Sequence, residues 1–234
     1  MLRVGVLGAT GRLGAAAVAA IDSADDLDAV ALDPRGALDM ASVDVAFDAT
    51  ILAASERIVD AAVAQCVPIV VGTSGWGAAR VEALRGRGAT GVRIVPNFSI
   101  GSVVGTHLAT IAARHLGAVE IVETHHERKV DAPSGTAVRT AEAIAAVRAV
   151  DAPTPDEPGR GVLVAGIPVH ALRLPGVSAR QEVVLGGTGE TLTIRHDTLG
   201  HEAYAAGILL ALRASRPAHV VVGLDDLLGL QDLA

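Results

Sequence analysis

The chain has 234 residues, of which 50% are apolar and only 2% aromatic, enough for one large domain or two small ones with aliphatic cores. Its formal net charge is -7 and no run of Lys and Arg could follow a phosphate backbone, so we expect no nucleic-acid partner. The single cysteine, Cys66, excludes an internal disulfide and a cysteine-rich zinc site; we interpret it as a small buried hydrophobe at the end of a helix.

No apolar run reaches the ~20 residues needed to span a bilayer, so we expect no membrane partner. The first residues enter a structured pattern directly, without a basic region or a cleavage site. These features lead us to expect a cytoplasmic protein.

The first half of the chain alternates short valine-rich runs with alanine-rich amphipathic stretches up to about residue 115. The valine-rich runs predict strands at 3–7, 28–32, 43–48, 68–71 and 92–95. The stretches between them predict helices at 13–21, 53–65 and 78–85. Because strands buried on both faces read as continuous apolar runs, this alternation favours parallel βαβ units with helices on both faces of one sheet.

The second half of the chain has a different character. A helix is predicted from Thr136 to about Val150, and 151–161, with three prolines and two glycines, is interpreted as a linker or mobile loop. Strand-like segments follow at 162–174, 182–185 and 191–196. The turn Gly186-Gly187-Thr188-Gly189 predicts a hairpin between the last two.

The tail predicts one more amphipathic helix over 202–215 and a valine-rich strand, 220–223, that rejoins the first domain. We therefore expect an α/β fold with two domains. The first, 1–98 and 206–234, is a Rossmann-like, parallel-sheet dinucleotide-binding domain. The second, 99–205, is an α+β substrate-binding domain with an open mixed sheet.

A glycine-rich turn lies between the first predicted strand and the first predicted helix. It reads Gly8-Ala9-Thr10-Gly11-Arg12-Leu13-Gly14. Glycines at these positions permit a tight turn and a close approach of backbone N–H groups to a pyrophosphate, so we expect dinucleotide binding here. The alternative is a glycine-rich turn that binds no ligand.

Asp33 closes the second predicted strand, where an acidic residue would accept hydrogen bonds from the adenine ribose and repel a 2′-phosphate. Arg12 and Arg35 could each pair with such a phosphate instead. The sequence is therefore compatible with NADH, NADPH or both. Both arginines could equally be solvated surface charges.

Two further segments each follow a strand of the same domain, namely Gly72-Thr73-Ser74-Gly75 and Pro96-Asn97-Phe98-Ser99. Loops at the carboxyl ends of parallel strands line the binding crevice, so these segments are candidates for contacts to the nicotinamide half of the cofactor. Turn chemistry alone would also explain them.

A second candidate site begins where an irregular segment gives way to a helix. Ser134 is suited to cap that helix, and the N–H groups of Gly135 and Thr136, with the Thr136 hydroxyl, would bind a carboxylate. Lys129 supplies a cation for the same anion. We interpret these residues as a site for a small dianionic substrate.

His125 and His126 precede this anion site in the same loop. A histidine beside a cation and an anion suits proton delivery near neutral pH. The alternative is that the two histidines end an edge strand and that Lys129 is a surface charge.

These residues carry a specific resemblance. The run His125-His126-x-x-Lys129-x-Asp131-Ala132-Pro133-Ser134-Gly135-Thr136-Ala137 resembles the signature of the 4-hydroxy-tetrahydrodipicolinate (dihydrodipicolinate) reductase family of lysine and diaminopimelate biosynthesis. The resemblance covers nearly the whole chain, including the segments Gly8 to Gly14, Asp48, Gly72 to Gly75, Pro96 to Gly101 and Gly189 to Asp197.

The resemblance implies an NAD(P)H-dependent reduction of a cyclic unsaturated imine dicarboxylate to tetrahydrodipicolinate. By the family pattern, His125 is the general acid and Lys129 assists and holds a carboxylate. His126 helps to bind the substrate, and Gly135 with Thr136 cradles the carboxylate. The family also implies a homotetramer joined through the sheets of the second domain, and closure of the two domains over the ligands.

The chain departs from the family pattern at the second carboxylate. His201 stands where an arginine of the family binds that group, and a neutral imidazole cannot make the bidentate contact of a guanidinium. Ala49-Thr50-Ile51-Leu52 also replaces a Phe-Thr run that follows Asp48 in the family, and the linker before Gly161 is short. These departures leave open a diverged paralogue that reduces a related cyclic imine in specialised metabolism.

Another class of function is a non-catalytic sensor that binds NAD(P)H, which would need the glycine turn but not the His, Lys and Thr of the second site. We expect no metal, because the histidines lack helical i, i+4 spacing and cysteine partners.

Overall fold

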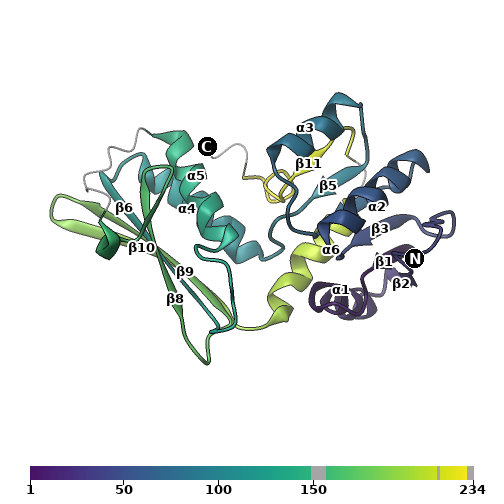
Figure 1. Cartoon of the computed structure of the whole chain (residues 1–234), viewed down its shortest axis with the longest axis horizontal. Helices are drawn as coiled ribbons and strands as arrows, with labels where there is room; N and C mark the ends of the chain where they lie inside the picture. The colour runs from purple at the N-terminus through teal and green to yellow at the C-terminus, as the bar shows by residue number, and fades with distance from the viewer. Residues whose placement is uncertain (149–156, 215–216, 231–234) are drawn as a thin grey trace. The chain divides into compact units, whose positions relative to one another are not determined.

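The computed structural model describes residues 1–148, 157–214 and 217–230 of the chain, which divides into two compact units (Figure 1). Unit 1 comprises Met1–Ile100 and His201–Leu228, and unit 2 is built on Gly101–Gly200. Within the described ranges, no helix combines the length and the apolar character needed to cross a bilayer.

Unit 1 contains a six-stranded sheet in which every pairing is parallel. Its strands are β1 (Leu2–Leu7), β2 (Leu27–Leu32), β3 (Val45–Asp48), β4 (Ile69–Val71), β5 (Val92–Ile94) and β11 (Val221–Val222), in the order β11-β5-β4-β3-β1-β2. The predicted Rossmann-like sheet is confirmed, with strand ends that differ by one or two residues. The pairing of β11 with β5 confirms that the tail rejoins this sheet.

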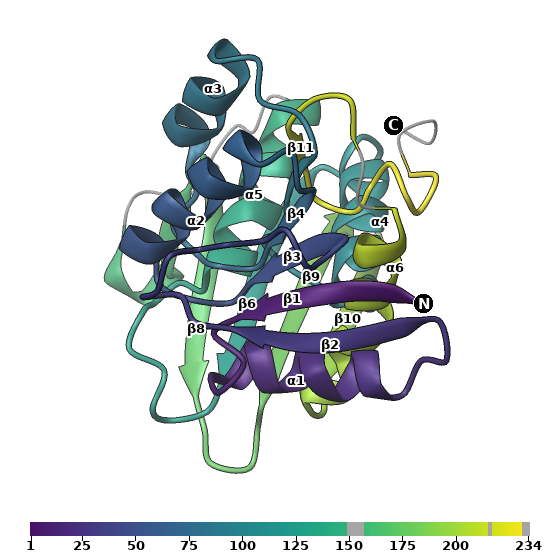
Figure 2. The ribbon, with the colours of Figure 1, turned by 90° about the vertical axis from the view of Figure 1, so that its right-hand side faces the viewer.

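Helices cover both faces of this sheet, as the continuous apolar strands predict. On one face, α1 (Arg12–Asp22) and α6 (Ala205–Arg213) share a core with β1 and β3. On the other, α2 (Leu52–Ala64) and α3 (Ala78–Gly86) pack in a second core. Figure 2 shows β1, β2 and β3 side by side with α1 along one face.

Two expectations for unit 1, an amphipathic helix in the tail and a buried Cys66 at a helix end, are confirmed only in part. The tail is not one helix over 202–215: a 3₁₀ turn, η2 (His201–Tyr204), precedes α6, as is common at helix ends. Cys66 is exposed and has φ +55°. It ends α2 in a Schellman motif, because its N–H bonds the Val63 oxygen while the Val67 N–H bonds the Ala62 oxygen.

Unit 2 contains a five-stranded mixed sheet in the order β10-β9-β6-β8-β7. Its strands are β6 (Ala118–His125), β7 (Val162–Val164), β8 (Ile167–Arg173), β9 (Ala179–Gly187) and β10 (Glu190–Thr198). Only the β6–β8 pairing is parallel. The predicted mixed sheet and the β9–β10 hairpin are therefore confirmed.

The segment 162–174, expected as one strand-like stretch, folds as a hairpin. Ala165 and Gly166 both have positive φ, 49° and 84°, and reverse the chain between β7 and β8. The helix expected to reach Val150 is α5 (Gly135–Val147). Of the expected linker, 151–156 lies outside the described residues, and a short 3₁₀ helix, η1 (Pro158–Arg160), follows.

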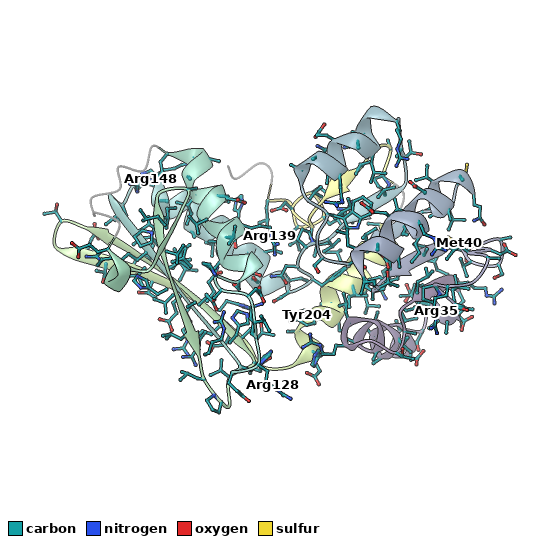
Figure 3. The ribbon with its side chains drawn as sticks, in the orientation of Figure 1. Arg35, Met40, Arg128, Arg139, Arg148 and Tyr204 are labelled. Atoms are coloured by element: carbon teal, nitrogen blue, oxygen red, sulfur yellow. The ribbon has the colours of Figure 1, made fainter. Side chains whose placement is uncertain are left out.

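Two helices, α4 (Ile100–Ala113) and α5, cover one face of this second sheet (Figure 1). Arg148, at the end of α5 (Figure 3), donates to the carbonyl oxygens of Ala113, Leu116 and Gly117, which ties the ends of the two helices together. The C-terminal carbonyls of a helix have no partner within the helix, so a guanidinium satisfies them.

The covered face changes from apolar to polar along the strands. One row across β8, β6, β9 and β10 is apolar and contains Val169, Ile121, Val183 and Ile194. The row two residues along is Ala171, Glu123, Gln181 and His196. The hydrophobic core thus ends at a group of polar side chains at the carboxyl end of β6.

Candidate active site

The glycine turn after β1 leads directly into α1. Gly8 has φ +84°, and a Cβ there would lie 2.5 Å from the Ala49 carbonyl oxygen. A Cβ on Gly14 would lie 2.0 Å from the Gly8 oxygen, so the first turn of α1 packs against the loop. No side chain caps α1 at Gly11. Its first N–H groups therefore suit an anion such as a pyrophosphate.

The loops predicted to bind the cofactor meet at the carboxyl edge of the parallel sheet. A Cβ on Gly72 would lie 2.6 Å from Leu13 Cδ2 and 2.9 Å from Phe98 Cε2, so the loops after β1, β4 and β5 are in contact. The Thr73 hydroxyl accepts the Thr50 N–H at 3.0 Å, which adds the loop after β3. Unit 1 thus brings these segments together, as their strand-end positions predict.

The remaining residues of these segments differ in exposure. Thr10, Arg12, Ser74 and Pro96 are exposed, and Ala9 is partly buried. Asn97 Oδ1 accepts the Ser99 N–H at 2.9 Å, which fixes the turn after β5.

Asp48 is a buried residue of this edge to which the sequence assigned no role of its own. It accepts the Thr50 N–H at 3.0 Å, the Thr50 hydroxyl at 2.6 Å and the Ser55 hydroxyl. Ser55 Oγ in turn accepts Trp76 Nε1–H at 2.8 Å, which ties α2 to the loop after β4. An acidic residue that ends an apolar strand and precedes a Thr by two positions could have indicated it.

Asp33 follows β2 and is exposed. Its Oδ1 accepts the Arg35 N–H at 2.9 Å, and the Arg35 Nε lies 4.0 Å from the same oxygen. The Arg35 side chain is 93% exposed. An exposed pair of this kind contributes little to stability, so both groups remain available to a ligand.

His125 is the last residue of β6, and the alternative interpretation of an edge strand is wrong. β6 lies at the centre of the sheet, paired with β8 on one side and β9 on the other. His125 Nδ1 lies 2.6 Å from Glu123 Oε2. Since an ionised carboxylate can only accept, Nδ1 donates a proton to Glu123 and Nε2 takes no part in this bond.

Glu123 and Arg173 are residues of this site that the sequence analysis missed. Glu123 is fully buried, and Arg173 donates to both of its oxygens, at 2.9 and 3.0 Å. Burial alone would raise the pKa of Glu123, but the hydrogen bonds from His125 and Arg173 outweigh it and lower that pKa. Strand periodicity could have indicated Glu123, since residues two apart share a face. No pattern in the sequence near Arg173 indicates that it belongs to this site.

His196 lies on the same polar row. A Cβ on Gly101 would come within 2.8 Å of its Cδ2, so the imidazole packs against the first turn of α4. Burial lowers the pKa of His196, and Asp197 offsets this only in part.

Lys129 lies in the loop after β6 and is mostly buried. Its ammonium donates to both carboxylate oxygens of Asp131, each at 2.8 Å. The Lys129 hydrogen bond lowers the pKa of Asp131. The cation predicted to hold a substrate carboxylate is therefore bonded to an exposed carboxylate of its own loop.

The predicted anion cradle is the first turn of α5. Ser134 caps the helix, with its Oγ accepting the Ala137 N–H at 3.2 Å. In the part of the chain that the structure describes, no acceptor takes the N–H groups of Gly135 and Thr136. Arg139, one turn along α5 (Figure 3), lies 3.5 Å from Thr136 Oγ1. These groups form a positive site suited to a carboxylate.

The remaining predicted substrate residues lie in different units. His126 follows β6 in unit 2, and its Nδ1 is buried without a hydrogen-bond partner among the described residues. His201 begins η2 in unit 1 and is exposed. Its ring lies edge-on to Tyr204, with centroids 6.2 Å apart.

A groove of about 740 Å³ in unit 2 is lined mainly by apolar residues of β7, β8 and the loop at Pro133. His125, Lys129 and the cradle amides do not line it. The polar group at the end of β6 is therefore separate from this groove. Nowhere in the described ranges do three or more His, Cys, Asp or Glu side chains assemble as a metal site.

The parallel sheet with its glycine turn, together with the histidine, lysine and anion cradle of unit 2, defines a nicotinamide-dependent oxidoreductase. Residues 101–228 match the family described as dihydrodipicolinate reductase, C-terminus. A 4-hydroxy-tetrahydrodipicolinate reductase of Clavibacter sepedonicus is 51% identical over 96% of this chain and 85% of its own. The chain belongs to the 4-hydroxy-tetrahydrodipicolinate reductase family.

Other comparisons agree. A 4-hydroxy-tetrahydrodipicolinate reductase of Mycobacterium marinum is 44% identical over 98% of this chain and 100% of its own. A dipicolinate-bound dihydrodipicolinate reductase from Paenisporosarcina sp. TG-14 matches with a TM-score of 0.80 and 28% identity, over 97% of this chain and 99% of that structure. A probable dehydrogenase from Thermotoga maritima, 12% identical with a TM-score of 0.63, shares the fold.

Proposed function

We propose that the protein reduces 4-hydroxy-tetrahydrodipicolinate, by way of the dihydro form, to tetrahydrodipicolinate in lysine and diaminopimelate biosynthesis. The observation that carries this proposal is the arrangement at the carboxyl end of β6. There a carboxylate-bonded histidine and a lysine occur together with the first N–H groups of α5, those of Gly135 and Thr136, which the Ser134 cap does not use. A reduction of a dicarboxylate imine needs a proton donor and anion-binding groups of this kind.

The residues of unit 1 fit a nicotinamide dinucleotide. Side chains at Gly8 or Gly14 would collide with backbone, so glycine at these positions lets the first turn of α1 pack against the loop, and the first N–H groups of α1 would bind the pyrophosphate. Asp33 would accept the ribose hydroxyls, and the loops at 72–74 and 96–98 would contact the nicotinamide half. When bound, the reduced nicotinamide supplies the hydride that adds to the substrate ring.

We propose that His125 acts as the imidazolium: it delivers the proton from Nε2 to the substrate and is left as the neutral ring with its remaining proton on Nδ1, hydrogen-bonded to Glu123. Lys129 and the N–H groups of Gly135 and Thr136 bind one substrate carboxylate, and His126 contacts the ring. Lys129 must exchange its bond to Asp131 for one to the substrate. The Asp131 side chain is 63% exposed and can return to water, so the exchange replaces one charged hydrogen-bond partner of Lys129 by another.

Either cofactor is compatible with the adenosine end of unit 1. Asp33 favours NADH because it repels a 2′-phosphate, whereas the exposed guanidinium groups of Arg12 and Arg35 can pair with that phosphate. We propose that the enzyme uses NADH, NADPH or both.

We also propose that the protein forms a homotetramer through the face of the second sheet opposite α4 and α5. On this face, exposed Leu172 and half-buried Val122 and Val184 lie among charged residues. An exposed face that mixes apolar and charged side chains in this way is compatible with a subunit interface. Light scattering that gave a monomer would contradict this.

His201 supports a second candidate, a paralogue that reduces a related cyclic imine. An imidazole in place of a guanidinium weakens the binding of a second carboxylate.

The test is oxidation of NADH and of NADPH by the purified protein, coupled to enzymatic synthesis of the hydroxylated precursor. We expect turnover of the dicarboxylate that His125→Ala reduces by about 10²-fold or more. Preferential turnover of a monocarboxylic cyclic imine would select the paralogue. Cofactor binding without oxidation of either nucleotide would contradict both.

A further inference from the structure

We infer that Glu123 is a positioning residue that sets the tautomer of His125 and holds the proton donor in fixed register with the carboxylate cradle. This inference rests on the proposed role of His125 as the general acid. Glu123 is not expected to touch the substrate, because it is fully buried beneath the histidine and the start of α5.

The carboxylate of Glu123 is saturated with donors. Oε2 accepts from His125 Nδ1 at 2.6 Å and from Arg173 at 2.9 Å. Oε1 accepts from the Ser134 N–H and from Arg173, both at 3.0 Å. One buried carboxylate therefore joins a side chain of β6, a side chain of β8 and the capping residue of α5.

Only an ionised carboxylate meets all these demands. An amide in its place would present a donor to one of the groups that now donate to it. Arg173 compensates the buried negative charge with two parallel hydrogen bonds, which keeps Glu123 ionised where an unpaired carboxylate would be costly. Because this carboxylate can only accept, His125 is held with its proton on Nδ1 and with Nε2 free to exchange a proton with the substrate.

The same carboxylate also fixes the cradle. Its bond to the Ser134 N–H holds the residue that caps α5, so the amides of Gly135 and Thr136 follow its position. Arg173 adds bonds to the carbonyl oxygens of Lys129 and Asp131, at 3.3 and 2.6 Å. The acid, the lysine loop and the anion site therefore depend on one Glu–Arg pair. Positioning of this kind is worth much in catalysis, since small displacements of a reacting group cost rate.

A Glu-to-Gln substitution distinguishes an effect of Glu123 on the tautomer of His125 from a general effect on the stability of the fold. In Glu123→Gln the amide oxygen can keep the bond to the Ser134 N–H, which preserves the cradle. The amide NH₂ then takes the place of Oε2 and faces both His125 and Arg173. It drives the imidazole to the opposite tautomer, with Nδ1 accepting, while Arg173 keeps its bond to the amide oxygen. We therefore expect kcat to fall on the order of 10²-fold while KM changes by less than about threefold.

The control is Asp226→Asn in unit 1. Asp226 forms a matched bidentate pair with Arg93, which is 2% exposed, through two contacts of 2.7 Å. Both substitutions remove the charge of one partner of a buried pair, so both are expected to lower thermal stability. Only Glu123→Gln should lower kcat strongly while leaving KM nearly unchanged.

The direct readout is the ¹⁵N resonances of the His125 ring in the wild-type protein, assigned by their loss in His125→Ala. We expect the neutral ring to carry its proton on Nδ1, and on Nε2 in Glu123→Gln. A proton on Nε2 in the wild type would overturn the inference even if the variant failed to fold. Full kcat in Glu123→Gln would also overturn it, provided that His125→Ala is impaired. If His125→Ala keeps full kcat, the proposed acid role itself has failed.

Discussion

At the scale of single residues, the Lys129 ammonium is paired with Asp131, a carboxylate of its own loop. Both carboxylate oxygens of Asp131 lie 2.8 Å from the Lys129 ammonium. Asp131 therefore binds the same ammonium group that is proposed to bind a substrate carboxylate. Since the Asp131 side chain is 63% exposed, the pair is weak enough to open when a dicarboxylate binds.

We predict that Asp131→Asn lowers KM for the dicarboxylate by about two- to fivefold with little change in kcat, because the substrate no longer competes with an internal carboxylate. Steady-state kinetics measure this. Glu127→Gln is the matched control, since Glu127 is an acidic residue of the same loop, 4.0 Å from Arg128 and outside the pair. A raised KM in Asp131→Asn would mean that Asp131 orients Lys129 for binding instead.

His201 permits a second prediction at this scale. If the position contacts the second carboxylate, His201→Arg should lower KM for the dicarboxylate by about threefold or more, since a guanidinium binds bidentately. A monocarboxylic imine should show no such gain, and serves as the control substrate. Unchanged KM and kcat for both substrates would show that His201 does not anchor a carboxylate.

At the scale of elements, the loops of unit 1 are held by close packing of glycines. Gly14 lets the first turn of α1 rest on the loop after β1, and Gly72 lets Leu13 and Phe98 approach from two sides. Steric contacts of this type fix the shape of a phosphate-binding turn more firmly than hydrogen bonds at its exposed surface.

Gly14→Ala should therefore raise KM for the nucleotide severalfold and destabilise unit 1 by about 1–3 kcal/mol, because its Cβ would lie 2.0 Å from the Gly8 oxygen. Thermal unfolding and cofactor titration measure the two effects. Gly77→Ala, at the start of α3, is the control: nothing lies within 4 Å of its added Cβ. Equal effects of the two substitutions would refute a steric role for Gly14.

Most elements of unit 1 were predictable because the strands are mainly apolar runs, although β2 contains Asp28 and β5 contains Arg93, and because helices such as α1 and α2 have an apolar face. The cap of α5 was predictable from Ser134, since capping is local. The Glu123–Arg173 pair was not, because its members are 50 positions apart and meet only when β6 and β8 pair. Cys66 was misjudged because composition indicates burial, whereas its position requires a left-handed backbone on the surface.

At the scale of the whole molecule, ion pairs join neighbouring strands of the second sheet. Asp197 of β10 accepts from Arg195 and from Arg180 of β9, each at 2.7 Å. These hydrogen bonds lower the pKa of Asp197 to about 2. The folded protein therefore binds a proton here only at a lower pH than the unfolded chain does.

The stabilisation from Asp197 is present above the unfolded pKa of 3.8 and is lost as the pH falls toward about 2. Asp197→Asn should thus make urea unfolding less dependent on pH between about 4 and 2, as measured by the unfolding midpoint at several pH values. Glu127→Gln again serves as the control. An unchanged slope in Asp197→Asn would show that this group does not contribute.

The discontinuity of unit 1 has a consequence for how the chain is made. During synthesis, 101–200 emerges as one uninterrupted stretch and can fold before α6 and β11 exist. Until β11 arrives, the edge of β5 has no neighbour, and the buried Arg93 lacks Asp226, its ionic partner from the last segment. The nascent nucleotide-binding half therefore has an open sheet edge and an uncompensated charge, and it is during this interval that a chaperone would have most to protect.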